Sequence, residues 1–185
     1  MPHRVCPWWI GYFLASPLRR LVHNPATILR PFVSEGMTVV EPGPGMGFFT
    51  MELARLVGRH GRVVAIDVQP KMLVELERRA GKAGLLDRIV TRQGPGNGMG
   101  IDDLKGQVDF VLAFAVVHEV PNAERFFAEV STVLKSGCRI LLTEPHFQVS
   151  EQEFAATLQM ADKNGFRVDS RPAIRWTRSA VLVKS

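Results

Sequence analysis

Short apolar runs alternate with longer amphipathic segments along most of the chain. Residues 48–60, 70–84 and 122–137 repeat apolar positions at three- and four-residue spacing, which is the pattern of a helix packed on one side. The runs between them are six to eight residues long and rich in Val, Ile and Leu, as buried parallel strands are. These runs span residues 37–42, 62–67, 88–93, 108–115 and 138–145. The alternation predicts a doubly wound α/β sheet with helices on both faces.

The pattern changes after residue 145. One more helix is predicted over about 151–164, followed by two strands at 166–176 and 178–184 that leave room only for a hairpin. The full prediction is therefore a Rossmann-like, mostly parallel sheet of seven strands that closes with an antiparallel hairpin strand. The glycine-rich segment 94–100 is predicted as a loop.

The size and composition of the chain favour a single domain. It has 185 residues, of which 46% are hydrophobic and 22% charged, so an ordinary globular core is expected. We assign residues 31–185 to that domain and residues 1–30 to a helical lid segment. The net charge of +5 suits an anionic partner, but the Lys and Arg residues are scattered, which favours solubility over nucleic-acid binding.

Two sequence features bear on compartment. Cys6 and Cys138 lie far apart without a CxxC spacing, and His3 with Cys6 is too little for a metal site, so neither a disulfide framework nor a bound metal is predicted. This favours a reducing cytoplasm. The apolar run at residues 8–15 is short, is interrupted by Gly11, and has no A-x-A cleavage pattern. No segment reaches the roughly 20 apolar residues of a membrane span. The run therefore predicts an amphipathic surface helix or a lid, whose aromatic residues either cover a substrate or pack on the sheet edge: Trp8, Trp9, Tyr12 and Phe13.

The most informative stretch is VVEPGPGMGFFT, residues 39–50. A strand followed by a glycine loop and the start of a helix is common to dinucleotide binders and to S-adenosylmethionine binders. The structural alternative is that the glycines only permit a tight turn. A GxGxxG fingerprint starting at Gly43 would need glycine at position 48, where the chain has Phe48. Pro42 and Pro44 each remove a backbone N–H that a pyrophosphate would use. Glu41 would repel phosphate but attract an ammonium or sulfonium group, so the loop favours a cation without phosphate.

These residues resemble the class I S-adenosylmethionine-dependent methyltransferases, and the likeness runs from about Leu29 to the C-terminus. The first motif of that family is an acid followed by alternating glycines. The resemblance implies that the loop, including Pro44, lies under the methionine and ribose of the cofactor, with the acid near the ammonium group. The motif is represented here by Glu41, Gly43, Gly45 and Gly47.

The second motif is the acid that ends the second strand, here Asp67. The resemblance implies that Asp67 binds the ribose hydroxyls and that Val68 flanks the adenine. The structural alternative is that Asp67 only caps the helix that begins at Pro70. Many relatives end the third strand with an acid that binds the adenine amino group. This chain departs from the pattern with Gln93 and Gly94, whose amide or backbone carbonyl would accept the same hydrogen bond.

The fourth and fifth strands also match the family in kind and spacing. The resemblance implies cofactor contacts at Ala113 and Phe114. His118, in the pair His118–Glu119 after the fourth strand, and His146 after the fifth are candidate general bases, because a neutral imidazole accepts protons near neutral pH. Each of these histidines is otherwise a hydrogen-bonding scaffold residue.

We therefore predict an enzyme that moves a methyl group from S-adenosylmethionine to a small-molecule acceptor. The resemblance is to the small, single-domain group that includes quinone-biosynthesis methyltransferases, for which an apolar ring acceptor is natural. An (Asn/Asp)-Pro-Pro-aromatic motif is absent after the fourth strand, and two separated cysteines do not suit arsenite. The alternatives are a non-catalytic methyltransferase-fold binding module, an RNA methyltransferase and a nicotinamide-dependent reductase. The oligomeric state stays open.

Overall fold

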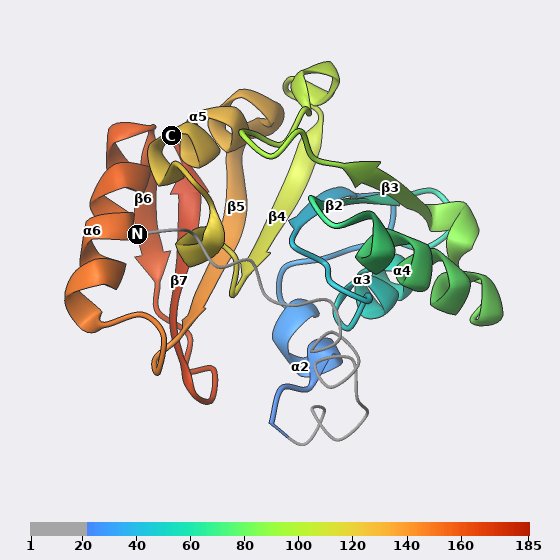
Figure 1. Cartoon of the computed structure of the whole chain (residues 1–185). Helices are drawn as coiled ribbons and strands as arrows, with labels where there is room; N and C mark the ends of the chain where they lie inside the picture. The colour runs from blue at the N-terminus through green and yellow to red at the C-terminus, as the bar shows by residue number, and fades with distance from the viewer. Residues whose placement is uncertain (1–21) are drawn as a thin grey trace.

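The computed structural model describes residues 22–185, which form a seven-stranded sheet in the order β3-β2-β1-β4-β5-β7-β6 (Figure 1). Neighbouring strands from β3 to β5 pair in parallel, and β7 is antiparallel to both β5 and β6. This confirms the predicted mostly parallel sheet with a closing hairpin. The strands are β1 (Thr38–Pro42), β2 (Arg62–Asp67), β3 (Ile89–Gln93), β4 (Val108–Phe114), β5 (Leu134–Pro145), β6 (Phe166–Ser170) and β7 (Thr177–Lys184).

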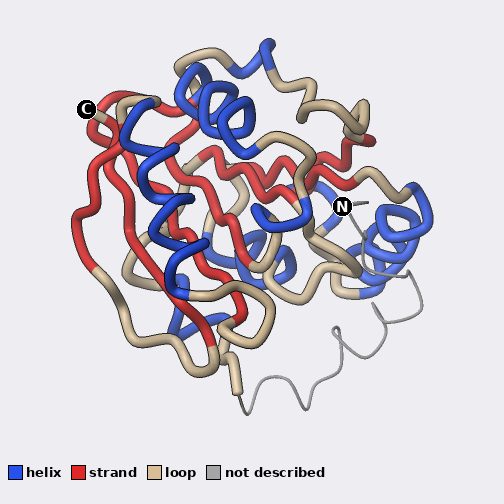
Figure 2. The backbone as a smooth tube through the Cα atoms, turned by 60° about the vertical axis from the view of Figure 1, so that its left-hand side comes forward, coloured by secondary structure: helices blue, strands red, loops and turns tan. Residues whose placement is uncertain are grey.

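Helices cover both faces of the sheet (Figures 1 and 2). Buried side chains of α2, α3 and α4 belong to one apolar cluster, and those of α5 and α6 belong to another. Successive strand residues alternate between the two clusters: Val39 faces the first and Val40 the second. The described helices are α2 (Pro25–Leu29), α3 (Thr50–Leu56), α4 (Pro70–Lys82), α5 (Ala123–Val133) and α6 (Glu151–Lys163), with 3-10 turns η2 (Leu86–Arg88), η3 (Asp102–Leu104) and η4 (Val117–Glu119).

Local sequence explains where these helices begin. Pro70 occupies the first turn of α4, where the missing N–H costs nothing. The Asn122 side chain caps α5 by accepting from the Arg125 N–H. Ser150 and Glu153 form a reciprocal capping box at α6. All three starts lie where the pattern of apolar positions places them, to within a residue.

The junction between α5 and β5 differs from the prediction. The helix was expected to continue to residue 137, but α5 ends at Val133 and β5 begins at Leu134. Leu134 pairs with Val108 on β4, and the register then shifts before the pairing resumes at Phe110. The Lys184 ammonium donates to the carbonyls of Ser131 and Leu134, at 2.5 and 2.7 Å, so long-range contacts end the helix early.

The connection from β3 to β4 has no α-helix. Residues 94–107 cross over as the predicted glycine-rich loop followed by η3. Met99, Ile101 and Leu104 bury their side chains in the cluster with α5. Glu129 on α5 accepts a 2.7 Å hydrogen bond from the Met99 N–H, which ties the loop to α5.

Several predictions fall outside the described residues. The aromatic lid residues Trp8, Trp9, Tyr12 and Phe13, and the pair His3 and Cys6, belong to residues 1–21. Within residues 22–185, no helix is long and apolar enough to cross a bilayer, and no group of three or more His, Cys, Asp or Glu side chains is arranged for a metal ion. Cys138 is a free thiol.

The strand order places a ligand site at one edge. β1 pairs with β2 on one side and with β4 on the other, so the chain reverses its winding between β1 and β4. Ligands of open α/β sheets bind outside the carboxyl ends of the strands at such a switch point. The segments that follow β1, β2, β4 and β5 meet there.

Candidate active site

The loop after β1 is shaped by its glycines. Gly43, Gly45 and Gly47 all have positive φ angles, of 64°, 54° and 86°. Residues with a Cβ rarely adopt this left-handed backbone conformation, so glycine is the residue that the turn requires. The Gly43 N–H donates to the Ile66 carbonyl at 2.9 Å, and the Gly47 N–H donates to the Pro44 carbonyl at 3.0 Å. The predicted loop is therefore a tight, hydrogen-bonded turn.

The loop is crowded on one side and open on the other. A Cβ added to Gly43 would lie 2.8 Å from the Val116 Cγ2, so the loop packs closely against the segment after β4. A Cβ added to Gly45 would meet nothing within 4 Å. The main chain at Gly45 is thus available for close approach by a ligand.

Two predicted acids lie beside this loop. Glu41 at the end of β1 is 3% exposed, and Asp67 at the end of β2 is 9% exposed. Asp67 Oδ1 accepts from the Gln69 N–H at 2.9 Å. Burial raises the pKa of Asp67, and hydrogen bonds from the main-chain N–H groups of Gln69, Gly45 and Val68 oppose that rise. The main-chain hydrogen bond from Gly43 to Ile66 holds the glycine loop against β2, the strand that ends at Asp67.

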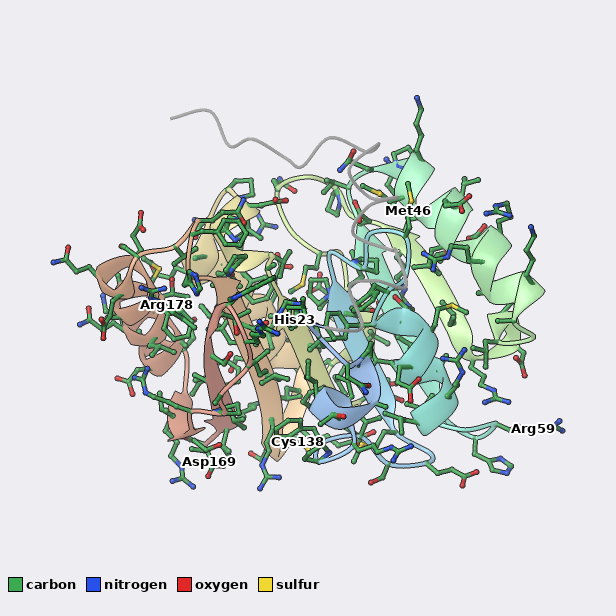
Figure 3. The ribbon with its side chains drawn as sticks, turned by 90° about the horizontal axis from the view of Figure 1, so that it is seen from below. His23, Met46, Arg59, Cys138, Asp169 and Arg178 are labelled. Carbon is green, nitrogen blue, oxygen red and sulfur yellow. The ribbon has the colours of Figure 1, made fainter. Side chains whose placement is uncertain are left out.

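A side chain of α4 supports the loop from outside. Arg79 Nη1 donates to the Met46 carbonyl at 2.7 Å. Met46 itself is buried, and it lies on the α3 and α4 side of the molecule in Figure 3. Sequence reasoning missed Arg79, because an arginine in a helix with several charged residues carries no local signal of this contact.

The predicted adenine-side residues have different surroundings. Val68 is 42% exposed and Gln93 is exposed, so both side chains are free to meet a ligand. Gly94 is buried, and its N–H donates to the Asp67 carbonyl at 3.0 Å. Ala113 is completely buried in the core cluster shared with α5, whereas Phe114 lies at the end of β4 with 8% exposure. Of the two β4 residues, Phe114 is the better placed for a ligand contact.

The segment after β4 brings His118 to the end of β5. His118 Nδ1 lies 2.5 Å from Glu144 Oε2, and the Val117 and His118 N–H groups donate to Glu144 Oε1 at 2.8 and 3.3 Å. The Glu144 side chain is 1% exposed and that of His118 is 20% exposed. Glu119 Oε1 lies 3.8 Å from His118 Nε2. The sequence does not reveal Glu144 as the partner of His118, because the two residues lie on different elements, 26 residues apart.

The pKa of His118 reflects competing effects. Burial of the imidazole opposes protonation, but the hydrogen bond to Glu144 and the negative charges of Glu144 and Glu119 outweigh burial. The pKa of His118 is therefore raised above its ordinary value. A carboxylate on Nδ1 also fixes the tautomer, which makes Nε2 the nitrogen that can accept a proton.

The second predicted base, His146, has a different setting. Its side chain is exposed, and among residues 22–185 the imidazole makes only an edge contact with Phe147, at 6.2 Å between ring centroids. The main-chain N–H of His146 donates to the Trp176 carbonyl at 3.1 Å. The structure does not bring the His146 ring into the His118–Glu144 pair.

His23 reaches the end of β4 through a contact that sequence reasoning missed. Its ring meets Phe114 edge-on at 5.2 Å, and its Nε2 lies 2.7 Å from the Arg175 carbonyl in the turn before β7. Phe114 also contacts Phe49, at 4.3 Å between centroids. Figure 3 shows His23 near the middle of the molecule, between Met46 and Arg178. Since 152 residues separate His23 from Arg175, no local pattern predicts this contact.

Comparison with known proteins identifies the class. Residues 33–174 match the methyltransferase-domain family. A solved S-adenosylmethionine-dependent methyltransferase from Aquifex aeolicus superposes with a TM-score of 0.85 at 26% identity, covering 97% of this chain and 98% of that one. The chain therefore belongs to the methyltransferase-domain family and has the class I fold, with S-adenosylmethionine as its cofactor.

Curated relatives are more distant. The ubiquinone/menaquinone biosynthesis C-methyltransferase UbiE of Brucella canis is 27% identical over 143 residues, which are 77% of this chain and 51% of that protein. An arsenite methyltransferase of Halobacterium salinarum is 27% identical over 112 residues, which are 60% of this chain and 28% of that protein. This chain thus spans about half or less of the curated relatives it matches.

Proposed function

We propose that this protein transfers a methyl group from S-adenosylmethionine to a small-molecule acceptor. The observation that best supports the cofactor site is the tight glycine loop after β1, whose Gly43 N–H donates to the Ile66 carbonyl on β2 and so holds the loop beside the buried Asp67 carboxylate at the switch point. When bound there, the cofactor supplies a methyl group that is already activated by the sulfonium charge. The protein then has to align the acceptor and exclude water.

The residues present suit this cofactor. Buried acids at Glu41 and Asp67 match an ammonium group and ribose hydroxyls, and the open main chain at Gly45 admits close contact. We expect Val68, Gln93 and Gly94 to border the adenine at the ends of β2 and β3, where this chain has Gln93 in place of the acid of many relatives. An adenine amino group would find the Gln93 amide oxygen or a loop carbonyl as acceptor.

Part of the small-molecule proposal comes from the relatives. The name of the UbiE relative specifies quinone biosynthesis, which supports a small-molecule acceptor for this chain. Arsenite is disfavoured, because a soft metalloid requires several thiolates and Cys138 lies in the half of β5 far from the site. The free thiol of Cys138 also suits the reducing cytoplasm in which we place the protein.

A second candidate acceptor is RNA. Four arginines occur along the hairpin region, and the chain carries a net charge of +5. A basic surface attracts phosphate in a salt-dependent manner. This reading is weaker, because the charge is not matched by exposed aromatic side chains at regular spacing on those strands. The arginines are Arg167, Arg171, Arg175 and Arg178.

The decisive experiment incubates the purified chain with methyl-labelled S-adenosylmethionine and either a small-metabolite extract or total RNA. Label in low-mass products supports the proposal, and label in RNA supports the second candidate. The Asp67→Ala variant is the control, because it should lose cofactor binding in a calorimetric titration. Cofactor binding without transfer to either pool would overturn the enzymatic proposal and leave a binding module.

A further inference from the structure

The glycine-rich loop after β3 is tied to α5 by a carboxylate. The Met99 N–H donates to Glu129 Oε2 at 2.7 Å, and Arg125 Nε donates to Glu129 Oε1 at 2.8 Å. We propose that Glu129 fixes the peptide unit between Gly98 and Met99 so that the Gly98 carbonyl accepts a hydrogen bond from the adenine amino group of the cofactor. This inference rests on the proposed function and deepens it by naming the group that contacts the base. Glu129 is then a positioning residue, because it acts through the main chain.

The orientation of this peptide unit follows from its geometry. In a planar trans peptide the N–H and the C=O point in opposite directions, and residues 22–185 contain no cis peptide bond. Because the Met99 N–H points to Glu129 on α5, the Gly98 carbonyl points away from that carboxylate. A charged acceptor on the N–H also polarises the peptide unit, which makes its carbonyl a stronger acceptor.

The Gly98 carbonyl lies near the end of β2. A Cβ built on Gly94 would be 3.4 Å from the Gly98 carbonyl oxygen and 3.7 Å from Val68 Cγ1, so the carbonyl and the Val68 side chain approach the same point. The Gly94 N–H donates to the Asp67 carbonyl at 3.0 Å, which holds the start of the loop at the end of β2. The carbonyl that Glu129 orients is therefore close to the residues that we expect to border the ribose and the adenine.

This carbonyl is free to accept a further hydrogen bond. Within residues 22–185, no N–H or O–H group donates to the Gly98 oxygen, although the residue is half-buried. A carbonyl without a donor becomes costly once a ligand excludes water from it. The amino group of adenine is a hydrogen-bond donor, so it would satisfy the Gly98 oxygen in a closed site.

The other candidate acceptor, the Gln93 amide, leaves β3 on the opposite face of the sheet. Ile89, four residues before Gln93 on the same strand, is buried in the cluster with α2, α3 and α4, and strand side chains at even spacing share a face. Ile66 belongs to the cluster with α5, and its Cγ2 lies 3.4 Å from the point where Val68 and the Gly98 carbonyl meet. An adenine that packs on Val68 therefore has the Gly98 carbonyl on its own face of the sheet.

The loop has little else to keep this peptide unit in one orientation. Four of the seven residues 94–100 are glycine, and glycine adopts many backbone conformations, so the Gly98–Met99 peptide can rotate once the carboxylate is removed. A Cβ on Gly98 would collide with Glu129 Oε1 and would lie 3.0 Å from Arg125 Nη2. The ion pair thus packs directly against the residue whose carbonyl it orients.

The first test follows amide hydrogen exchange at Met99 by NMR. In Glu129→Ala the Met99 N–H loses its acceptor and should exchange about tenfold faster or more. The amide of Val111, a buried residue of the central strand β4, reports global unfolding and serves as the internal reference. Glu124→Gln is the matched control, because Glu124 is an exposed acid on the same helix. Equal Met99 exchange in wild type and Glu129→Ala would overturn the role of Glu129.

The second test compares two ligands by calorimetry: S-adenosylhomocysteine and the analogue whose purine carries hydrogen in place of the amino group. The wild-type chain should bind the amino compound about tenfold more tightly. In Glu129→Ala this ratio should fall to about twofold or less, because the carbonyl is no longer held toward the base. Arg125→Met keeps Glu129 but removes its partner, so the ratio should fall by a smaller factor. A purely structural role of Glu129 would weaken both ligands equally.

The outcomes separate this inference from the proposed function. A wild-type chain that binds neither compound contradicts the proposed function. A wild-type chain that binds both compounds equally keeps that function and overturns the inference, as does an unchanged ratio in Glu129→Ala. Loss of the ratio in Gln93→Ala, with the ratio kept in Glu129→Ala, would assign the amino group to the Gln93 amide and would also overturn it.

Discussion

At the carboxyl edge of the sheet, the region beside β1 and β2 differs from the region beside β4 and β5 in the groups that form it. On the side of β1 and β2, the edge is made by the main chain of the glycine loop and by two buried acids, Glu41 and Asp67, at the ends of two strands that follow each other along the chain. On the side of β4 and β5, the surface is made by pairs of long side chains from distant segments, such as His118 with Glu144. The first side tolerates little change, because its shape depends on backbone conformation. The second side can change its side chains without altering the sheet.

The largest loss of stability is expected where a side chain is added to the main-chain side. In Gly43→Ala, the new Cβ would meet Val116 Cγ2 at 2.8 Å, and the residue has a φ of +64°. Left-handed strain of about 1–2 kcal/mol and overpacking of about 1–3 kcal/mol should together lower the free energy of unfolding. Urea denaturation measures this loss, and calorimetry should show weaker cofactor binding.

Gly36→Ala is the matched control for that change. Gly36 has a φ of +85°, but a Cβ there would meet nothing within 4 Å, and the residue lies before β1, away from the loop. The control should lose only the cost of the backbone strain, about 1–2 kcal/mol, and should keep its cofactor affinity. Equal losses in both variants would mean that the contact with Val116 does not constrain the loop.

A smaller effect is expected at the support from α4. Arg79→Met removes the donor to the Met46 carbonyl, and losing a charged hydrogen bond to a part-buried acceptor costs about 1–3 kcal/mol. Arg78→Met, at the adjacent residue, removes an exposed ion pair with Glu75, and loss of such a pair should change stability by less than about 1 kcal/mol. Thermal unfolding of the two variants compares them. If Arg78→Met destabilises as much as Arg79→Met, the contact with Met46 is not a specific support.

The same division explains what the sequence could predict. Runs of Val, Ile and Leu and helix starts such as Ser150 with Glu153 are local signals, so the sheet, the hairpin and most helix starts were predicted. The end of α5 was wrong, because Leu134 follows its pairing with Val108 and not its local propensity. The glycine loop and Asp67 each form a short local motif at the end of a strand, so the sequence singles them out as cofactor-binding residues, and this role stays a prediction.

The side-chain contacts beside β4 and β5 had no such local signal. His118 was identified from its position after a strand, but its partner Glu144 lies 26 residues away on another strand. His23 contacts a carbonyl 152 residues later, and only the folded sheet brings the two together. His146 had the same positional signal as His118 but has an exposed ring, which shows that position after a strand does not determine where a side chain lies.

The pH dependence of stability provides a moderate effect beside β4 and β5. The pKa of His118 is raised in the folded chain, so its stabilising contribution is complete below the unfolded value of about 6.5 and is lost as pH rises through the folded value. The difference in unfolding free energy between wild type and His118→Asn should therefore shrink as pH increases above about 6.5. Urea titrations across this range check it. A difference that grows with pH would contradict the sign.

The smallest change in stability is expected for a substitution at Asp67, and this substitution should stabilise the chain where the others destabilise it. Burial raises the pKa of Asp67 in the folded chain, so the stabilisation from its protonated form is present below the unfolded pKa and lost as pH rises through the folded pKa. At neutral pH the buried charge therefore costs stability, and Asp67→Asn should stabilise the unliganded chain by about 0.5–1 kcal/mol while weakening cofactor binding. Asp109→Asn offers the contrast, because Asp109 accepts from the Thr38 N–H and pairs with Lys135, so its loss should destabilise. A lower melting temperature for Asp67→Asn would mean that the hydrogen bonds from Gly45, Val68 and Gln69 outweigh burial, and that the acid is present for the fold and not for the ligand.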